Sequence, residues 1–350
     1  MLMTNSIKWR SPSNIALIKY WGKKGNQLPA NASLSFTLSN SFTETELRFA
    51  EKKSPSKEIE LAFFFEGKAQ PDFETKIKKY FQNITAELPF LTKNQFEIHS
   101  KNSFPHSVGI ASSASGMSAL ALCVCSLEEL EKGITSNPEA FFRRASVLSR
   151  LGSGSASRSV YGGIVTWGKI EGLPDTSDEF ASPFQGKTDT IFHDFHDDIL
   201  VVSSQKKDVS SRAGHELMNA HPFAQSRYGQ ASQNLHELTA CMANGNLLRF
   251  CDIVENEALT LHALMFSSSP AVVLFQPGTI DIIKKVRKFR EQTGIPVCFT
   301  IDAGPNVHLL YPNSVKVDIG QLIQQELVVS CEHNQVISDN VGKGPLKLSA

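Results

Sequence analysis

The feature that most constrains this fold is a cationic side chain inside an apolar segment. The run Asn14–Trp21, NIALIKYW, has the composition of a buried strand, yet it contains Lys19. Burying an unpaired ammonium group costs several kcal/mol on an order-of-magnitude scale. The fold therefore has to give this lysine a partner.

Length and charge narrow the class of protein. The chain has 350 residues, more than one hydrophobic core usually serves, so we expect two lobes. Hydrophobic residues make up 41% and charged residues 20%, as in ordinary globular proteins. Lys plus Arg (35) equals Asp plus Glu (35), whereas a nucleic-acid binder normally has a basic excess. We therefore expect no nucleic-acid partner.

The cysteines and the apolar runs bear on location. The six cysteines form no CxxC pair, and we expect all of them to be buried apolar residues in a reducing compartment. No apolar run reaches the roughly 18 residues that span a bilayer. The start, MLMTNSIKWR, lacks the apolar stretch of an export signal. The sequence favours a cytoplasmic protein without a membrane partner.

Strand patterns joined by short turns precede helical patterns, which predicts an α+β fold. We expect lobes at 1–190 and 191–350, with the polar segment Gly172–Lys187 as a boundary or surface excursion. Strands are predicted at Asn14–Trp21, Ala32–Leu38, Thr43–Phe49, Ile59–Phe65, Gln95–Ser100, Gly162–Gly168, Ile199–Val202, Val297–Asp302, His308–Tyr311 and Gln335–Ile337. Helices are predicted at Phe73–Ile84, Ser113–Leu130, Pro138–Leu151, Ala213–Met218, Ala224–Ala243, Leu247–Phe266, Thr279–Thr293 and Ile319–Val328.

Two Ser/Gly loops are candidate anion sites. In NSFPHSVGIASSASGMSALAL (Asn102–Leu122), small residues lead into an apolar helix, whose free N–H groups and dipole attract phosphate. It is neither a Walker loop nor a dinucleotide fingerprint. In SRLGSGSASRSVYGGIVTWG (Ser149–Gly168), Ser153, Ser155 and Arg158 could bind a carboxylate or phosphate. A helix cap and a surface loop are the alternatives.

Three further patterns carry polar groups. Asp302 ends an apolar strand beside a Gly-Pro turn, where a carboxylate either does chemistry or simply makes the turn. His193 and His196, amid aspartates, fit a polar turn before a strand better than a metal site. Ser210 and Ser211 precede a helix and could cap it or contact an anion. Together the residue types indicate a phosphoryl-transfer or phosphate-ligand enzyme.

These islands resemble the mevalonate diphosphate decarboxylases of the GHMP kinase superfamily. The match runs in order through SPSNIALIKYWGK, LPANASLSFTL, FPHSVGIASSASG, RLGSGSASRSVYGG, VSSRAGHELM, FTIDAGPNVHLL and NVGKGPLKL, and spans most of the chain. The resemblance implies a two-lobed α+β fold, with an N-terminal lobe like ribosomal protein S5 domain 2 and a ferredoxin-like C-terminal lobe. It places the active site in the cleft between them, and it implies a homodimer.

The resemblance also implies the reaction, ATP-dependent decarboxylation of (R)-5-diphosphomevalonate to isopentenyl diphosphate. It implies Asp302, Lys19 and Arg158 as catalytic residues, and ATP with Mg²⁺ as cofactors. Substrate-binding residues would be Tyr20, Trp21, Lys23, Ser153, Ser155, Arg158, Ser210 and Ser211. Residues at the ATP phosphates would be Ser107, Gly109, Ala111, Ser112 and Ser113, with Ser113 at the metal.

Three other functions stay open from the sequence. One is a decarboxylase of mevalonate 5-phosphate, and another is a mevalonate-type kinase of the same superfamily. The third is a non-catalytic sensor of phosphorylated ligands, against which the presence of Asp302 argues.

Overall fold

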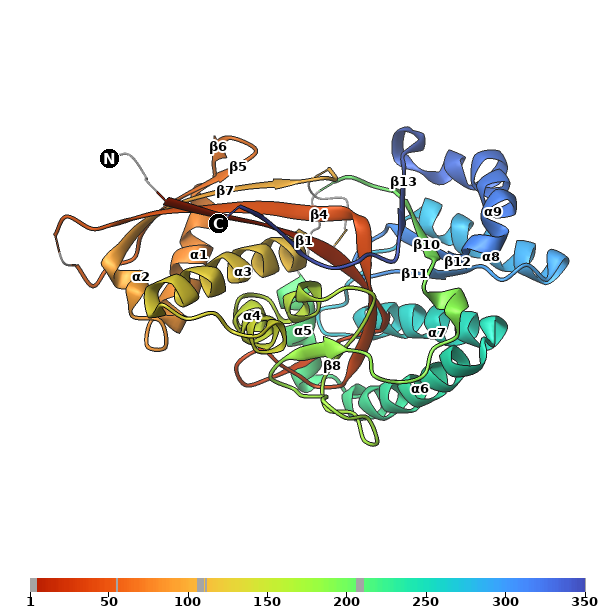
Figure 1. The fold of residues 1–350 in the computed structure, drawn as a ribbon. Helices are drawn as coiled ribbons and strands as arrows, with labels where there is room; N and C mark the ends of the chain where they lie inside the picture. Colours follow the sequence, from red (N-terminus) through yellow and green to blue (C-terminus); the bar gives the residue numbers. More distant parts are fainter. Residues whose placement is uncertain (1–4, 55, 106–109, 111, 206–210, 350) are drawn as a thin grey trace.

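The computed structural model describes residues 5–54, 56–105, 110, 112–205 and 211–349, without the side chains of residues 211 and 212. In this part of the chain, eight strands form one mixed sheet and four form a second, antiparallel sheet (Figure 1). The strands of the large sheet are β1 (Asn5–Ile18), β4 (Ser33–Glu51), β5 (Glu60–Phe65), β6 (Lys68–Ala69), β7 (Asn94–Asn102), β8 (Ile164–Trp167), β9 (Ala181–Pro183) and β14 (Leu346–Ser349).

The long strands β1 and β4 are neighbours within the large sheet. They pair antiparallel from Asn5 opposite Phe49 to Ile18 opposite Leu34. Exposure alternates along the first residues of β1, as expected where one face is solvated, and burial becomes continuous from Ser11 onward. That second half is covered on both sides. β1 therefore delivers Lys19, the next residue, into the interior.

Helices cover one side of the large sheet. They are α1 (Pro71–Ile84), α2 (Phe90–Lys93), α3 (Ser112–Lys132) and α4 (Pro138–Gly152), followed by the short 3-10 helix η1 (Gly154–Val160). The apolar helix α3 packs on β1 and β4. At the start of α4 the Asn137 side chain accepts a hydrogen bond from the N–H of Ala140, and Pro138 occupies the first turn, so this helix start is capped.

The second sheet has the strand order β11-β12-β10-β13. Its strands are β10 (Phe195–Leu200), β11 (Cys298–Thr300), β12 (Val307–Pro312) and β13 (Val336–Asn340). Its helices are α5 (Ser211–Glu216), α6 (Ala224–Asn244), α7 (Leu247–Phe266), α8 (Pro277–Thr293) and α9 (Lys316–Leu322). Short elements complete the chain: the hairpin β2 (Lys23–Lys24) and β3 (Leu28–Pro29), the 3-10 turns η2 (Thr190–Phe192), η3 (Leu217–Ala220), η4 (Asn313–Val315), η6 (Val328–Ser330) and η7 (Glu332–Asn334), and the π-helical turn η5 (Ile323–Leu327).

One hydrophobic cluster joins the two halves of the chain. Phe36 of β4 lies 5.7 Å from Phe195 of β10 and 6.5 Å from Phe250 of α7, measured between ring centroids. Ile15 and Leu17 of β1 belong to the same cluster. Helix α7 also contacts both β1 and β11. The ends of β1 and β11, which carry Lys19 and Asp302, are therefore held together by a shared core.

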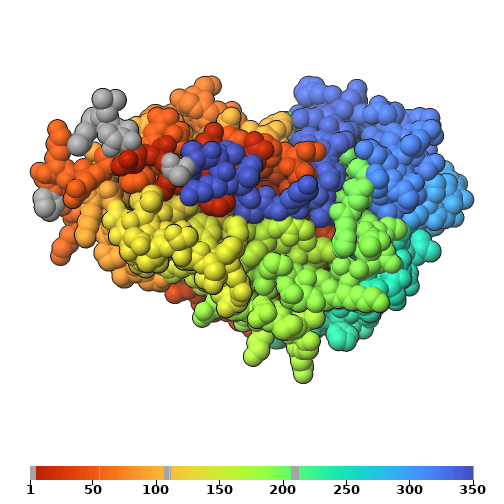
Figure 2. All heavy atoms as spheres, viewed as in Figure 1, coloured from red at the N-terminus to blue at the C-terminus, as the bar shows by residue number. Residues whose placement is uncertain are grey.

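The C-terminal residues return to the first strand. Strand β14 pairs antiparallel with β1, and in Figure 2 the C-terminal residues (blue) lie against N-terminal ones (red and orange). Close backbone contact explains two glycines there. A Cβ on Gly342 would lie 2.3 Å from the carbonyl oxygen of Leu38, and one on Gly162 would lie 2.3 Å from the main chain of Lys343.

The α+β fold class is confirmed, and several predicted boundaries are wrong. The strand predicted to end at Trp21 ends at Ile18, and the strands predicted on either side of residues 39–42 are one strand, β4. The strand predicted from Ile199 begins at Phe195. The segment Gly172–Lys187 contains β9, which pairs with β8 and so belongs to the large sheet.

Two general expectations can be checked directly. All six cysteines are buried free thiols, as predicted. Among the described residues, no helix combines the length and the apolar character that crossing a membrane requires.

Candidate active site

The buried lysine is paired with the strand-end aspartate. The Nζ atom of Lys19 lies 2.6 Å from Oδ1 of Asp302, which follows β11 by two residues. The Lys19 side chain is 2% exposed, whereas that of Asp302 is 31% exposed. Burial lowers the pKa of Lys19, and the carboxylate of Asp302 partly offsets that shift. The pair thus presents its acidic member to the outside.

Arg158 is the second buried cation beside this pair. It comes from η1 and is 3% exposed. Its Nε donates to Oδ1 of Asn14 at 3.1 Å and its Nη1 to the hydroxyl of Ser33 at 2.7 Å, so β1 and β4 fix its plane. Burial lowers the pKa of Arg158 to about 10, and the negative charge of Asp302 raises it. Two cations therefore act on one carboxylate.

Aromatic rings follow Lys19 directly. The rings of Tyr20 and Trp21 lie 4.3 Å and 4.6 Å from the imidazole of His215 on α5. The Gly22 N–H donates to Nδ1 of His215 at 3.0 Å. Burial lowers the pKa of His215 to about 3, and the charge of Lys23 acts in the same direction. The imidazole is consequently neutral, with its proton on Nε2.

The hydroxyl of Tyr20 faces the Ser/Gly turn. Within the described part of the chain this buried oxygen has no hydrogen-bond partner. A Cβ on Gly154 would lie 2.8 Å from it. Ser153 is the C-cap residue that follows α4, and the carbonyl of Ser155 accepts a hydrogen bond from the side chain of Asn14 at 3.2 Å. An unpaired buried hydroxyl beside a glycine turn is suited to a polar ligand.

The start of α3 is the candidate phosphate site. The helix begins at Ser112, and Ser113 in its first turn is exposed. Such a start presents free N–H groups and a partial positive charge. The predicted residues Ser107, Gly109 and Ala111 lie outside the described residues, as do Ser210 and the side chain of Ser211.

No acidic or histidine cluster suited to a metal occurs among the described residues. His196 of β10 instead stacks on Tyr311 of β12 and bonds to Asn313, which follows β12. Mg²⁺ that arrives with a nucleotide usually needs only one or two protein ligands besides the phosphates. The exposed hydroxyl of Ser113 at a helix start fits that kind of donor set.

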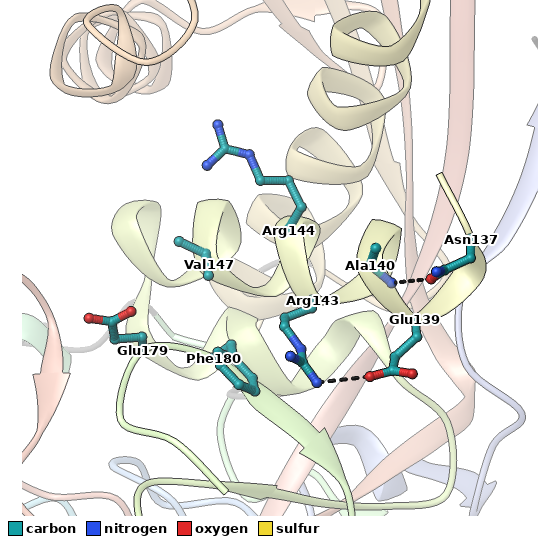
Figure 3. Close-up of a pocket in the computed structure, with 8 residues that line it drawn as sticks. All are labelled: Asn137, Glu139, Ala140, Arg143, Arg144, Val147, Glu179 and Phe180. Atoms are coloured by element: carbon teal, nitrogen blue, oxygen red, sulfur yellow. Dashed lines mark hydrogen bonds and ion pairs between the residues drawn. The ribbon is translucent and has the colours of Figure 1, made fainter. Parts of the chain in front are cut away.

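A surface hollow of about 460 Å³ lies elsewhere, between α4 and the segment before β9 (Figure 3). Its arginines are already engaged. Arg143 pairs with Glu139 and lies over the ring of Phe180, and Arg144 pairs with Glu87 and Glu128. Because these cations are neutralised, we assign the hollow no role in the chemistry.

Several side chains of the site were not singled out in the sequence. Asn14 and Ser33 hold Arg158, and the Asn31 amide donates to the carbonyl of Lys19 at 2.9 Å. His215 was also missed. The signal was weak, because small polar residues are common beside strands and helices.

Comparison with known proteins identifies the family. Residues 11–181 match the diphosphomevalonate decarboxylase-like N-terminal domain, and residues 198–347 match the mevalonate 5-diphosphate decarboxylase C-terminal domain. A diphosphomevalonate decarboxylase of Candida albicans is 30% identical over 319 residues, covering 86% of this chain and 83% of that protein. The chain belongs to the diphosphomevalonate decarboxylase family. The relative from Ganoderma lucidum is 32% identical, covering 89% of this chain and 80% of its own.

Solved structures of this family have the same fold. The Staphylococcus aureus mevalonate diphosphate decarboxylase superposes with a TM-score of 0.83 at 32% identity, over 98% of both chains. A structure described as MDDEF in complex with MVAPP, AMPPCP and magnesium has a TM-score of 0.83 at 29% identity, over 99% of both chains. That relative therefore binds MVAPP, AMPPCP and magnesium together.

Proposed function

We propose that Lys19, Arg158 and Asp302 carry the reaction of this family, ATP-dependent decarboxylation of (R)-5-diphosphomevalonate. The products are isopentenyl diphosphate, ADP, phosphate and CO₂. The observation that supports these roles is the partly exposed carboxylate of Asp302, which is bonded to the buried Lys19 and lies within the electrostatic reach of Arg158.

Asp302 acts first in this scheme. The C3 hydroxyl of the substrate is a poor leaving group until it carries a phosphoryl group. Asp302 first accepts a hydrogen bond from that hydroxyl and then takes its proton. Meanwhile the hydroxyl oxygen attacks the γ-phosphorus of ATP, and the bond between this phosphorus and the oxygen of the departing ADP breaks. Lys19 holds the carboxylate in place through its 2.6 Å contact. Mg²⁺ held at Ser113 would offset negative charge on the phosphates of ATP.

Arg158 acts on the second half of the reaction. Phosphate leaves with the electron pair of the C3–O bond, so positive charge develops at C3. The C1–C2 bond then breaks, its electrons form the C2=C3 double bond, and CO₂ departs. The Arg158 guanidinium, fixed by Asn14 and Ser33, binds the carboxylate of the substrate through two hydrogen bonds and so aligns the C1–C2 bond that breaks.

The remaining predicted residues bind the two phosphorylated ligands. Tyr20, through its unpaired hydroxyl, and the turn with Ser153 and Ser155 suit the substrate's diphosphate. We assign Trp21, Lys23, Ser210 and Ser211 to the same ligand. We assign Ser107, Gly109, Ala111, Ser112 and Ser113 to the ATP phosphates, with Ser113 on Mg²⁺.

A substrate panel tests the function. Purified protein with MgATP is given mevalonate, its 5-phosphate or its 5-diphosphate, and CO₂ and ADP are followed together. We expect equal CO₂ and ADP with the diphosphate. ADP without CO₂ would indicate a kinase, preference for the monophosphate would change the substrate, and no turnover of any compound would favour a sensor.

We further propose that the protein is a cytoplasmic homodimer. Sedimentation equilibrium should then give twice the 38.5 kDa mass of one chain. A mass equal to one chain at micromolar concentration would contradict the homodimer.

A further inference from the structure

Helix α7 reaches the main chain of both members of the catalytic ion pair. The Oε2 atom of Glu257 accepts a hydrogen bond from the backbone N–H of Lys19 at 2.8 Å. The Nε2 atom of His262 lies 3.1 Å from the carbonyl oxygen of Asp302. Because a carbonyl can only accept, Nε2 of His262 carries the hydrogen. Both side chains are 0% exposed.

Glu257 is itself fixed by a second helix. Arg227 of α6 donates Nη1 to Oε1 at 2.7 Å and Nη2 to Oε2 at 2.5 Å. Its Nη2 also donates to the carbonyl of Lys19 at 3.1 Å. Asn234 donates to Oε1 at 2.7 Å. The ion pair Arg227–Glu257 therefore holds both backbone polar groups of Lys19, which lies past the end of β1.

Stability alone accounts poorly for such a pair. Buried ion pairs can often be replaced by apolar residues at no cost in stability. Two residues earlier on α7, Glu255 (2% exposed) pairs with Arg290 (13% exposed) and Arg287 (42% exposed), away from the catalytic pair. What distinguishes Glu257 is where its hydrogen bonds go, namely to Lys19.

We propose that α7 positions the catalytic pair: Glu257, held by Arg227, fixes the main chain of Lys19, and His262 fixes the main chain of Asp302. These are positioning residues, and the proposal rests on the catalytic roles proposed above for Lys19 and Asp302. Five residues of one helix span about 7.5 Å along its axis, so α7 sets the spacing of the two anchors. A misplacement of about 1 Å can cost on the order of 10²-fold in rate.

Two substitutions of His262 separate hydrogen bonding from packing. The imidazole stacks on Phe275, with centroids 4.0 Å apart. His262→Phe keeps the stacking ring and loses the donor, whereas His262→Gln keeps a donor and loses the ring. We expect kcat to fall at least about tenfold in His262→Phe and to be largely retained in His262→Gln. The opposite ranking would overturn the positioning role of His262.

Glu257→Gln tests the other anchor, with Glu255→Gln as the matched control on the same helix. Asp302, Glu257 and Arg158 are the charged groups that act on Lys19. Removing the Glu257 charge should lower kcat about tenfold with little change in the KM for ATP. It should also move the alkaline limb of kcat/KM to lower pH, because that charge raises the pKa of Lys19. Glu255→Gln should change neither.

Folding has a separate check. If Glu257→Gln does not fold, the double variant Arg227→Met with Glu257→Gln also removes the cation that has lost its partner. We expect this double variant to melt at the same temperature as the wild type and to show the same kinetic losses. A folded variant with unchanged kcat and pH profile would overturn the role of Glu257. The variant Asp302→Asn tests the proposed catalytic site separately from the positioning role of α7. If Asp302→Asn is inactive while the α7 variants have normal activity, only the positioning proposal is wrong.

Discussion

At the scale of the residue, Lys19 shows how a cation is accommodated in an apolar setting. Its ammonium group bonds to Asp302, its backbone N–H donates to Glu257, and its carbonyl accepts from Arg227. A buried charge whose hydrogen bonds are met in this way avoids most of the penalty of an unpaired one. A substitution that removes one of these partners should therefore destabilise the folded protein.

Asp302→Asn removes the proton acceptor and keeps the shape. We expect kcat to fall by about 10³-fold, the scale of a lost general base, while the affinity for ATP is retained. Turnover assays and nucleotide titration measure the two quantities. The exposed Asp318→Asn is the control, and it should be fully active. Near-normal turnover of Asp302→Asn would remove Asp302 from the mechanism.

Arg158→Lys keeps the positive charge but loses the planar guanidinium with its several N–H donors. A lysine cannot bond Asn14 and Ser33 while gripping a carboxylate. We expect a loss on the order of 10²-fold in kcat/KM for the substrate. Steady-state kinetics measure it, with Arg143→Lys on α4 as control. If the two variants behaved alike, Arg158 would not hold the substrate.

His215 should make stability fall in acid. Its folded pKa of about 3 lies below the ordinary 6.5, so the unfolded chain binds a proton that the folded chain refuses. This stability is present above pH 6.5 and declines below it, by up to about 1.4 kcal/mol per pH unit. His215→Asn retains an acceptor for the Gly22 N–H and should flatten the decline in urea unfolding. Parallel pH profiles would contradict this.

Unusual residue types were the ones that the sequence revealed. A lysine in an apolar run and an aspartate at a strand end stand out, and the structure brings Lys19 and Asp302 into contact. Glu257, Arg227 and His262 do not stand out, because such residues are ordinary on the solvated face of a helix. Only the folded structure shows that these three side chains are buried.

At the scale of the element, β4 shows why a strand boundary was misjudged. The polar stretch Ser39–Ser41 has the composition of a turn. In the structure Asp339 of β13 accepts hydrogen bonds from all three backbone N–H groups there, at 2.7–2.8 Å. A partner about 300 residues away in the chain, invisible to local patterns, thus keeps the strand continuous.

Asp339→Asn tests that contact. An amide places a donor against one of the N–H groups, so we expect the free energy of unfolding to fall by about 2–3 kcal/mol. Urea denaturation followed by circular dichroism measures the change. Activity per folded molecule should be less affected than stability. An unchanged midpoint would show that the backbone N–H groups of Ser39–Ser41 need no such acceptor.

At the scale of the whole molecule, the two lobes predicted from length share a core. Phe36, 1% exposed, packs on Phe195 and Phe250 from the other half of the chain. Chain length could predict more than one lobe, but not that β1 and β4 would pack against the second. The division into lobes at residue 190 stays a prediction, and the packing implies one folding unit.

Unfolding should therefore be cooperative across both lobes. Tryptophan fluorescence, which reports on Trp9, Trp21 and Trp167 of the N-terminal half, and far-ultraviolet circular dichroism should give coincident urea transitions. Phe36→Ala should lower the free energy of unfolding by about 3–5 kcal/mol without separating the two transitions. Two resolved transitions in the unmodified protein would contradict the shared core.

The burial of all six thiols has a practical consequence. Burial raises the pKa of Cys123 to about 12 and that of Cys331 to about 11, so little thiolate exists in the native protein. Maleimide reagents should leave the native enzyme nearly unlabelled. A cysteine introduced on the surface of each lobe would then accept a dye selectively. The distance between the two dyes, with and without ATP, could then be measured by energy transfer without removing any native sulfur.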